Sequence, residues 1–496
     1  MKRFFRRALI WLARIAVVLI VLLIIFYAEE DWRGAHDWAV CQKELQAKGE
    51  TLDLRQLAPP GKPEDDLSKV PIFAELYQEN EEYQKTKKST TKPRIRRVTI
   101  DFNWSPVLHN NVPATLSLLK DSANDLTAWQ KYYRSIPDTR LPKQMGTPAQ
   151  DILWALTQYD SELNEIDAAV SNPNAYWPVD YERPFDGYLG GVTELIPIAR
   201  VILLRGVAHL DNRQADLAEK DYFFSFRLNR PLTKGCFSIN YLVMQGVRAI
   251  DDFILQDGLH RHAWNDAQLR EMESALASTD MLALAADSFR TERASLIQTI
   301  KVFQGMDPDI VWKAKASENA VLYYLLKTAP IRSSGWWDQD RVVYCRDRQK
   351  QIDAIDSRDG MLHIAAFPSH RIMDDWNRVD ETSIWDAIYT PMSAEVRPFV
   401  DNMGLKIAKA ETYRRLARLA CRLEEYRIAH GQYPDKLDEL PDLPAHLNQE
   451  VLSEEPLRYQ RKGDGYLLYS IGWNQKDDGG VLAKDDKEGD WVWPSP

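Results

Sequence analysis

The 496-residue sequence lacks the short motifs that identify most enzymes. It contains no H-E-x-x-H, G-x-S-x-G, G-x-x-x-x-G-K-[ST] or G-x-G-x-x-G. These patterns serve zinc hydrolysis, serine nucleophiles, phosphate loops and dinucleotide binding, because each places its functional groups at a fixed spacing. No reaction class is therefore indicated, and a protein without catalytic activity is the favoured interpretation.

Cysteine is scarce, and the four residues lie far apart without a C-x-x-C pair: Cys41, Cys236, Cys345 and Cys421. This spacing excludes a zinc ribbon and a thioredoxin-like redox motif. One or two disulfides are permitted if the body of the protein lies outside the cytoplasm. Buried free thiols are the alternative, and the sequence does not decide between them.

Clustered positive charge is also missing. The net charge is −10, and the one basic run, residues 85–97, is short and interrupted by threonine and proline. Nucleic-acid binding needs grouped lysines and arginines to neutralise phosphates, so we expect no nucleic-acid partner. A hydrophobic content of 45% and a charged content of 27% are typical of a folded protein.

Only one stretch is apolar enough to span a lipid bilayer. Residues 8–27 are apolar except for Arg14 and have about the twenty residues that a membrane-spanning helix needs. Basic residues precede this stretch and acidic residues follow it, so the positive-inside rule predicts a cytoplasmic N-terminus and an extracytoplasmic body. A cleaved signal peptide is the alternative, but a small-x-small cleavage site is missing. We therefore predict a single-pass anchor in a bacterial cytoplasmic membrane.

The rest of the chain predicts a mainly α protein with a small antiparallel β subdomain at its C-terminal end. We divide it into the cytoplasmic tip and anchor (1–30), a stalk and linker (31–112), a helical body (113–404), and a long helix followed by the β subdomain (405–496). Alternating apolar residues over 97–104 predict one strand in the linker. The body has the form of either a helical bundle or a repeat array.

Two body segments have clear helical signals. Apolar residues between 152 and 166 recur at three-four spacing, and Thr147 followed by Pro148 suits a helix start. Residues 199–231 predict a pair of helices that resembles one tetratricopeptide unit. The positions that carry this resemblance are Ile202, Gly206, Ala218 and Tyr222. No 34-residue period continues beside it, so a generic helix pair fits equally well.

The C-terminal segment combines a hairpin pattern with an acidic loop. Residues 455–473 predict two strands joined by a Gly-Asp-Gly turn. The candidate metal ligands in the loop after them are Asp477, Asp478, Asp485, Asp486 and Asp490. A helix-loop-helix calcium site is excluded, because Lys476 and Asp485 stand where its third and twelfth ligands are needed. A non-helical calcium site and a solvated acidic turn remain open.

The same segment resembles the C-terminal part of the major pseudopilin of type II secretion systems. The matching residues are Gly431, Tyr433, Pro434, Tyr459, Tyr469, Ser470, Gly472, Gly479 and Gly480. The resemblance covers about 80 residues and implies a β subdomain whose Asp/Gly loop binds calcium, with Asp485 and Asp486 nearest the family's ligands. Trp473 and Asn474 depart from the family pattern, and the prepilin processing site is absent. The whole layout also resembles bacterial proteins with one N-terminal anchor and a helical extracytoplasmic body.

Two functions follow as expectations. The first is a non-enzymatic scaffold that binds other proteins of the cell envelope and contacts the bilayer through residues 8–27. The alternative is a carbohydrate-binding protein or glycoside hydrolase that uses the rings of Trp336 and Trp337, which we expect to be buried between helices. His260 and His262 could ligate a metal but have no partner at a recognisable spacing, so we expect a surface pair at a helix end.

Overall fold

The computed structural model describes residues 2–59, 61–86, 93–98, 126–136, 141–179, 191–305, 332–356, 359–367, 403–444, 446–482 and 487–494. Helices dominate these residues, which confirms the mainly α prediction. In chain order the helices are α1 (Lys2–Ala47), α2 (Pro71–Thr86), α3 (Thr127–Ser135), α4 (Pro148–Leu156), α5 (Asp160–Ser171), α6 (Leu195–Asp211), α7 (Ala215–Leu228), α8 (Ser238–His260), α9 (Asp266–Ala277), α10 (Met281–Gln304), α13 (Ser334–Asp353) and α16 (Met403–His430). The strands are β1 (Ile355–Asp356), β2 (Met361–Leu362), β3 (Arg458–Lys462), β4 (Gly465–Ser470) and β5 (Trp491–Trp493).

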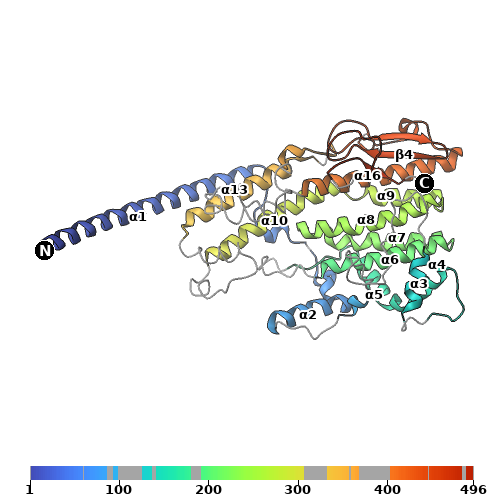
Figure 1. Cartoon of the computed structure of the whole chain (residues 1–496), viewed down its shortest axis with the longest axis horizontal. Helices are drawn as coiled ribbons and strands as arrows, with labels where there is room; N and C mark the ends of the chain where they lie inside the picture. Colours follow the sequence, from blue (N-terminus) through green and yellow to red (C-terminus); the bar gives the residue numbers. More distant parts are fainter. Residues whose placement is uncertain are drawn as a thin grey trace.

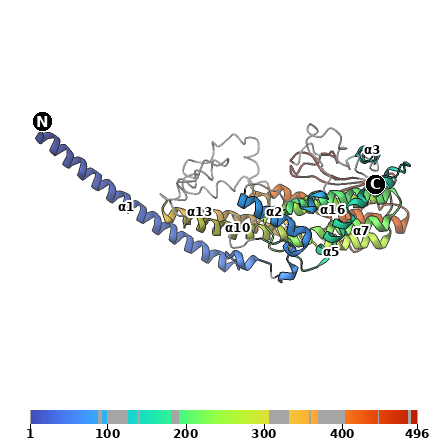
Figure 2. The ribbon, with the colours of Figure 1, turned by 90° about the horizontal axis from the view of Figure 1, so that it is seen from below.

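The body is an elongated array of helices from which α1 projects as a long rod (Figure 1). The C-terminal part of α1 lies along α13, and α10 joins α13 to the remaining helices. Figure 2 shows the same arrangement from below, with the N-terminus far from the body. Among the described residues, α1 alone is long and apolar enough to cross a membrane, although a signal sequence would pass the same test.

Two of the predicted segments can be compared with the described elements. The boundary placed after residue 30 separates the apolar stretch from the rest of α1, which continues without a break to Ala47. The strand predicted over 97–104 begins with Arg97, which here ends a 3-10 helix, η4 (Arg94–Arg97). Residues 99–104 lie outside the described part of the chain.

The helix predicted from Thr147 onward begins where its cap signals place it. The Thr147 hydroxyl accepts a hydrogen bond from the Gln150 backbone N–H, and the Gln150 side chain accepts one from the Thr147 N–H. This reciprocal cap satisfies two backbone donors that the first helical turn leaves free. The segment then divides into α4 and α5 at a short 3-10 turn, η5 (Thr157–Tyr159).

The helix pair predicted over 199–231 is present as α6 and α7, a hairpin joined by a three-residue connection. Gly206 faces α8, where a Cβ atom at its position would lie 3.1 Å from Ile254 Cδ1. Ala218 and Tyr222 are buried. The small residues therefore let α6, α7 and α8 pack closely, whether or not the pair belongs to a repeat family.

The C-terminal hairpin forms as predicted, and a third strand completes its sheet. β3 pairs antiparallel with β4 across the Gly-Asp-Gly turn, and β4 pairs antiparallel with β5. β5 contributes Trp491 and Trp493, whose side chains are buried. The sheet packs on α16, and Gly431, the residue that follows this helix, has a positive φ of 76°.

A buried carboxylate joins this C-terminal part to the helical body. Glu424 of α16 accepts hydrogen bonds from Arg427 (2.7 Å) and from the hydroxyl of Tyr433 (2.6 Å), and it lies 2.9 Å from Nδ1 of His262 in the turn before α9. The Tyr433 ring packs edge-on against Tyr466 of β4 at 4.9 Å. Burial alone would disfavour the charge, but the hydrogen bonds outweigh it and lower the pKa of Glu424 below its ordinary value.

We expect Glu424→Gln to lower the free energy of unfolding at neutral pH by about 2 kcal/mol, because charged hydrogen bonds are lost. The pKa of Glu424 in the folded state lies below its ordinary value of 4.5, so the carboxylate stabilises the fold above pH 4.5. That stability disappears as the pH falls through the folded-state pKa. Urea unfolding of full-length protein, followed by tryptophan fluorescence, should show the difference from wild type shrinking below about pH 4.5.

The matched control is Glu455→Gln, since the Glu455 side chain is 58% exposed in its salt bridge with Arg458. Its effect should stay within about 0.5 kcal/mol at every pH. A Glu424→Gln difference that does not change with pH would contradict the assignment.

Candidate functional site

The acidic loop predicted as a calcium site is organised by two of its aspartates. Asp490 is fully buried, and its two carboxylate oxygens accept hydrogen bonds from the backbone N–H groups of Asp478 (3.3 Å) and Gly480 (2.7 Å). Gly480 has a φ of 78°, which favours glycine at this turn. The Asp490 carboxylate thus closes the loop by binding backbone amides.

Asp477 makes a second set of hydrogen bonds in the same loop. Its Oδ1 accepts hydrogen bonds from the Tyr469 hydroxyl (3.0 Å) and the Gly479 N–H (3.0 Å), and its Oδ2 accepts one from Arg458 (3.1 Å). These contacts, led by the backbone bond from Gly479, lower the pKa of Asp477 below its ordinary value. The carboxylate therefore stays ionised and ties the loop to β3 and β4.

The described aspartates do not make a metal site by themselves. Calcium takes six to eight oxygen ligands, whereas each carboxylate oxygen of Asp477 and Asp490 already accepts a hydrogen bond. Within the described ranges, no group of three or more His, Cys, Asp or Glu side chains could hold a metal ion. Asp485 and Asp486 lie outside those ranges, so calcium binding by the full set stays a prediction.

We expect Asp490→Ala to destabilise the protein by about 2 kcal/mol, because two backbone donors lose their acceptor. The loss should be equal in calcium and in chelator, since the role of Asp490 is internal to the loop. Thermal unfolding measured by circular dichroism in both conditions checks this. Glu454→Ala, at an exposed position nearby, is the control. A loss seen only in calcium would instead make Asp490 a calcium ligand.

The two histidines singled out in the sequence lie at the end of α8. His260 is the last residue of that helix, and His262 lies in the turn that follows, with a φ of 51°. His262 is engaged with Glu424, as described above. The pair therefore marks a helix end, and His262 joins that end to α16.

The tryptophan pair lies where α13 meets α1. The Trp337 side chain is buried, as expected, whereas Trp336 is half-buried against α1. Its ring lies 5.9 Å from the ring of Tyr27 and 6.4 Å from that of Phe26, and its indole N–H donates to Glu30 (2.9 Å). These rings are used to pack the body on α1.

This packing extends along a junction between α1 and α13. The polar contacts across it join Glu30 to Trp336, Asp31 to Ser334 and Gly335, Asp37 to Gln339, Glu44 to Arg346, and Lys48 to Asp353. The partners are always 302 to 306 positions apart in the sequence. A nearly constant separation means that the two helices run parallel in a single register.

Two glycines allow the helices of the junction to approach. A Cβ atom at Gly34 would overlap the backbone of Gly335, and one at Gly335 would overlap the carbonyl of Glu30. The Gly335 N–H donates to the Asp31 carboxylate across the same contact (2.9 Å). Any larger side chain at either glycine must push the helices apart.

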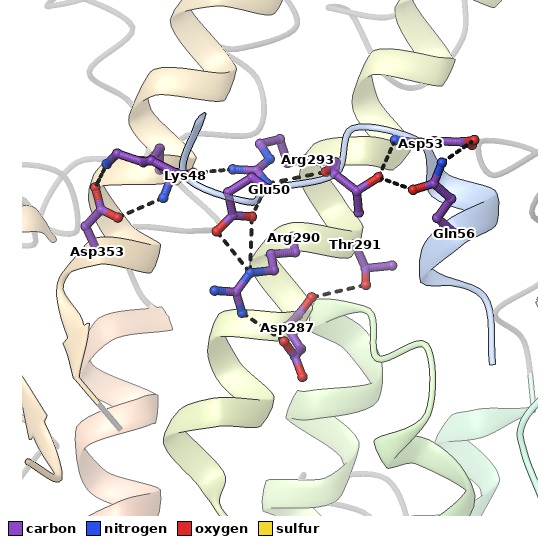
Figure 3. A network of polar contacts seen from close by, with 11 residues as sticks. Lys48, Glu50, Asp53, Gln56, Asp287, Arg290, Thr291, Arg293 and Asp353 are labelled. Atoms are coloured by element: carbon purple, nitrogen blue, oxygen red, sulfur yellow. Dashed lines mark hydrogen bonds and ion pairs between the residues drawn. The ribbon is translucent and has the colours of Figure 1, made fainter. Parts of the chain in front are cut away.

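A clamp of charged groups fixes the end of α1 to the body (Figure 3). The chain leaves α1 through Gly49, whose φ is 78°, and the next residue, Glu50, reaches α10. Its carboxylate accepts hydrogen bonds from Arg290 (3.1 Å) and Arg293 (2.6 Å). Arg293 is fully buried and also donates to Gln349 of α13 (2.5 Å). Leaving a buried guanidinium without its carboxylate costs about 3–5 kcal/mol, so the clamp resists opening.

A second candidate site is a cleft in the part of the body formed by α5, α7 and α9. Its volume is about 680 Å³. Charged side chains of both signs line it, including Asp167, Arg205, Glu219, Lys220, Asp221, Arg227, Arg230 and Glu271. Arg227 is paired with Asp167 (2.6 Å), and Arg205 with Asp221 (2.7 Å). The arrangement offers alternating charges to a polar ligand or protein surface.

Comparison with known proteins adds no constraint to these sites. No protein-family model matches the chain, and no curated protein or solved structure matches it. The resemblance of the C-terminal segment to pseudopilins stays a prediction.

The junction was not predicted from the sequence, although half of it carries a signal. Gly34, Trp38, Cys41 and Leu45 recur at three-four spacing beyond the apolar stretch, as expected for a helix packed on one face. All four are buried or half-buried. The stripe could have indicated a partner for this helix, but nothing in it identifies α13.

We expect Gly335→Leu to lower the free energy of unfolding by about 3 kcal/mol, because overpacking separates α1 from α13. Gly335→Ala should have a smaller effect of the same sign. Urea unfolding of the full-length protein in detergent measures both. Ala35→Leu, on the exposed face of α1, is the control and should stay within about 0.5 kcal/mol. Equal effects at positions 35 and 335 would contradict the packing.

Proposed function

We propose that the chain is a non-enzymatic, single-pass membrane protein that holds a protein-binding surface on the extracytoplasmic side of a bacterial cytoplasmic membrane. Residues 8–27 cross the bilayer, with basic residues on the cytoplasmic side and acidic residues at 29–31 on the other. The absence of catalytic sequence motifs supports a binding role.

The junction between α1 and α13 is the observation that carries the proposal. About twenty residues of α1 follow the apolar stretch, which corresponds to about 30 Å of helix. This length is bonded to the body from Glu30 to Glu50. A helix that served only to tether the protein to the membrane would not need a fixed register of contacts with α13. The junction instead holds the body in one orientation relative to the membrane.

The aromatic rings at the start of the junction support the placement of the bilayer surface. Phe26 and Tyr27 end the apolar stretch, and Trp336 packs on both. Tryptophan and tyrosine concentrate at membrane–water interfaces, where their apolar rings and polar atoms are both accommodated. The first turn of α13 thus lies at the membrane surface, and the body extends from there.

The charged cleft is the surface that we assign to a partner. It is bordered by helices of the half of the body that lies away from the N-terminus (Figure 1). Charges of both signs favour a partner with a complementary pattern, since such complementarity selects among proteins and orients the encounter. Envelope proteins with charged, exposed segments are the class that fits.

Photo-crosslinking in intact cells tests the proposal. We expect a photoreactive amino acid at Lys220 or at Ser274, which are exposed at the cleft, to give an adduct with the same envelope protein. Arg230→Glu should reduce the yield at least about fivefold, because it reverses a charge of the cleft. The control position is Lys350, whose side chain is 71% exposed on α13.

Adducts of equal yield and identity at Lys350, or none at the cleft, would reject the cleft as the binding surface. Protease added to spheroplasts of the same cells tests the topology. We expect it to digest the body and to spare a fragment that contains residues 8–27. A body protected until the membrane is dissolved would reject the extracytoplasmic location.

A further inference from the structure

Two cysteines that are far apart in the sequence meet inside the junction. Cys41 of α1 and Cys345 of α13 are both fully buried, and they share a small apolar cluster with Leu45, Ile297 and Val342. The two thiols interact closely enough that each shifts the pKa of the other. The other two cysteines, Cys236 and Cys421, are also buried, and the groups that shift the pKa of each include no cysteine.

The register of the junction holds the two thiols together. Cys41 and Cys345 are 304 positions apart, which falls inside the range of 302 to 306 found for the polar contacts. Asp37 bonds Gln339 on one side of the pair (2.7 Å), and Glu44 bonds Arg346 on the other (3.4 Å). The helices cannot slide without breaking both contacts. A disulfide needs Cβ atoms about 3.5–4.5 Å apart, and facing positions on two closely packed helices are where side chains of distant segments meet at short range.

The electrostatic environment distinguishes the two thiols. The interaction with Cys345 lowers the pKa of Cys41, and the guanidinium groups of Arg346 and Arg293 act in the same direction against burial. The same interaction and burial raise the pKa of Cys345. Burial raises the pKa of Cys236 and of Cys421 as well. In the packed junction Cys41 is therefore the more acidic thiol of the pair.

We propose that Cys41 and Cys345 form a disulfide bond that joins the anchor helix covalently to α13 when the body lies in an oxidising compartment. The proposal rests on the extracytoplasmic location proposed above. It makes the junction a modification site, in which a redox reaction decides whether the body is held on its anchor by packing alone or by a covalent bond.

The oxidant is a disulfide-donating oxidoreductase or a small-molecule disulfide. The Cys41 thiolate attacks one sulfur of the donor disulfide, forming a mixed disulfide and releasing the other donor sulfur as a thiolate. Cys345 loses its proton and attacks the Cys41 sulfur, which releases the second donor sulfur. Two electrons pass from the pair to the donor, and the two thiol protons end on the donor sulfurs. Because both cysteines are buried in the packed junction, the donor reacts with Cys41 before α1 is seated on α13, and Cys345 attacks the mixed disulfide as the two helices come together.

Peptide mapping of the full-length protein tests the disulfide. Cells are treated with N-ethylmaleimide, and the purified protein is denatured in fresh N-ethylmaleimide, so that buried thiols also react, and is digested with trypsin without reduction. Trypsin releases Cys41 in residues 34–43 and Cys345 in residues 342–346. We expect these peptides as one linked species, at least tenfold more abundant than either maleimide-labelled peptide, and separated by dithiothreitol. The internal controls are Cys236 in residues 235–248 and Cys421 in residues 419–422, which should carry the label.

Variants confirm the assignment. Cys345→Ala should leave the peptide with Cys41 fully labelled, whereas Cys236→Ala should leave the linked species unchanged. A linked species that joins Cys41 to any cysteine other than Cys345 would overturn the inference.

The outcomes separate this inference from the proposed location. A linked species that forms only after purified protein meets oxidised glutathione supports the pairing and rejects an oxidising location. Labelled, unlinked peptides under both conditions overturn the pairing. If the protease experiment places the body outside the cytoplasm and the peptides are still unlinked, the pairing fails while the location stands.

Discussion

The backbones of α1 and α13 touch at Gly34 and Gly335, and the other contacts of the junction depend on that approach. Without Cβ atoms at these positions, carboxylates on α1 can reach the first turn of α13, where Asp31 accepts from the Gly335 N–H. The contact is local, but it sets the distance between two helices over their shared length. Farther along the two helices, Asp37 can therefore bond Gln339, and Glu44 can bond Arg346.

Buried charge gives this packing its specificity. Arg293 has no exposed surface, and it needs both Glu50 from beyond α1 and Gln349 from α13. Apolar contacts tolerate small slips between helices, whereas an unsatisfied guanidinium does not. Arg415 has a similar place in α16, where it donates to backbone carbonyls of Gly360 and of the segment before β3. In both cases one arginine joins elements that are distant in the sequence.

Local elements could be predicted from the sequence because their signals are local. The cap at Thr147, the helix stop at Gly431 and the turn between β3 and β4 each depend on neighbouring residues. β5 was missed because it is three residues long and is defined only by pairing with β4. The acidic loop was identified, but the internal role of Asp490 depends on backbone amides that folding brings to it. The junction depends on a register between segments about 300 residues apart, which neither helix specifies alone.

The unbroken course of α1 has a mechanical consequence. In the proposed membrane-anchored arrangement, a helix that is bonded to the body over about 30 Å acts as a lever arm whose pivot lies in the bilayer. Transmembrane helices adjust their tilt to the thickness of the surrounding membrane. A change in tilt of about 10° would move the far end of this arm by about 5 Å, and the body would swing with it. In that proposed arrangement, the thickness of the membrane sets the direction in which the charged cleft points.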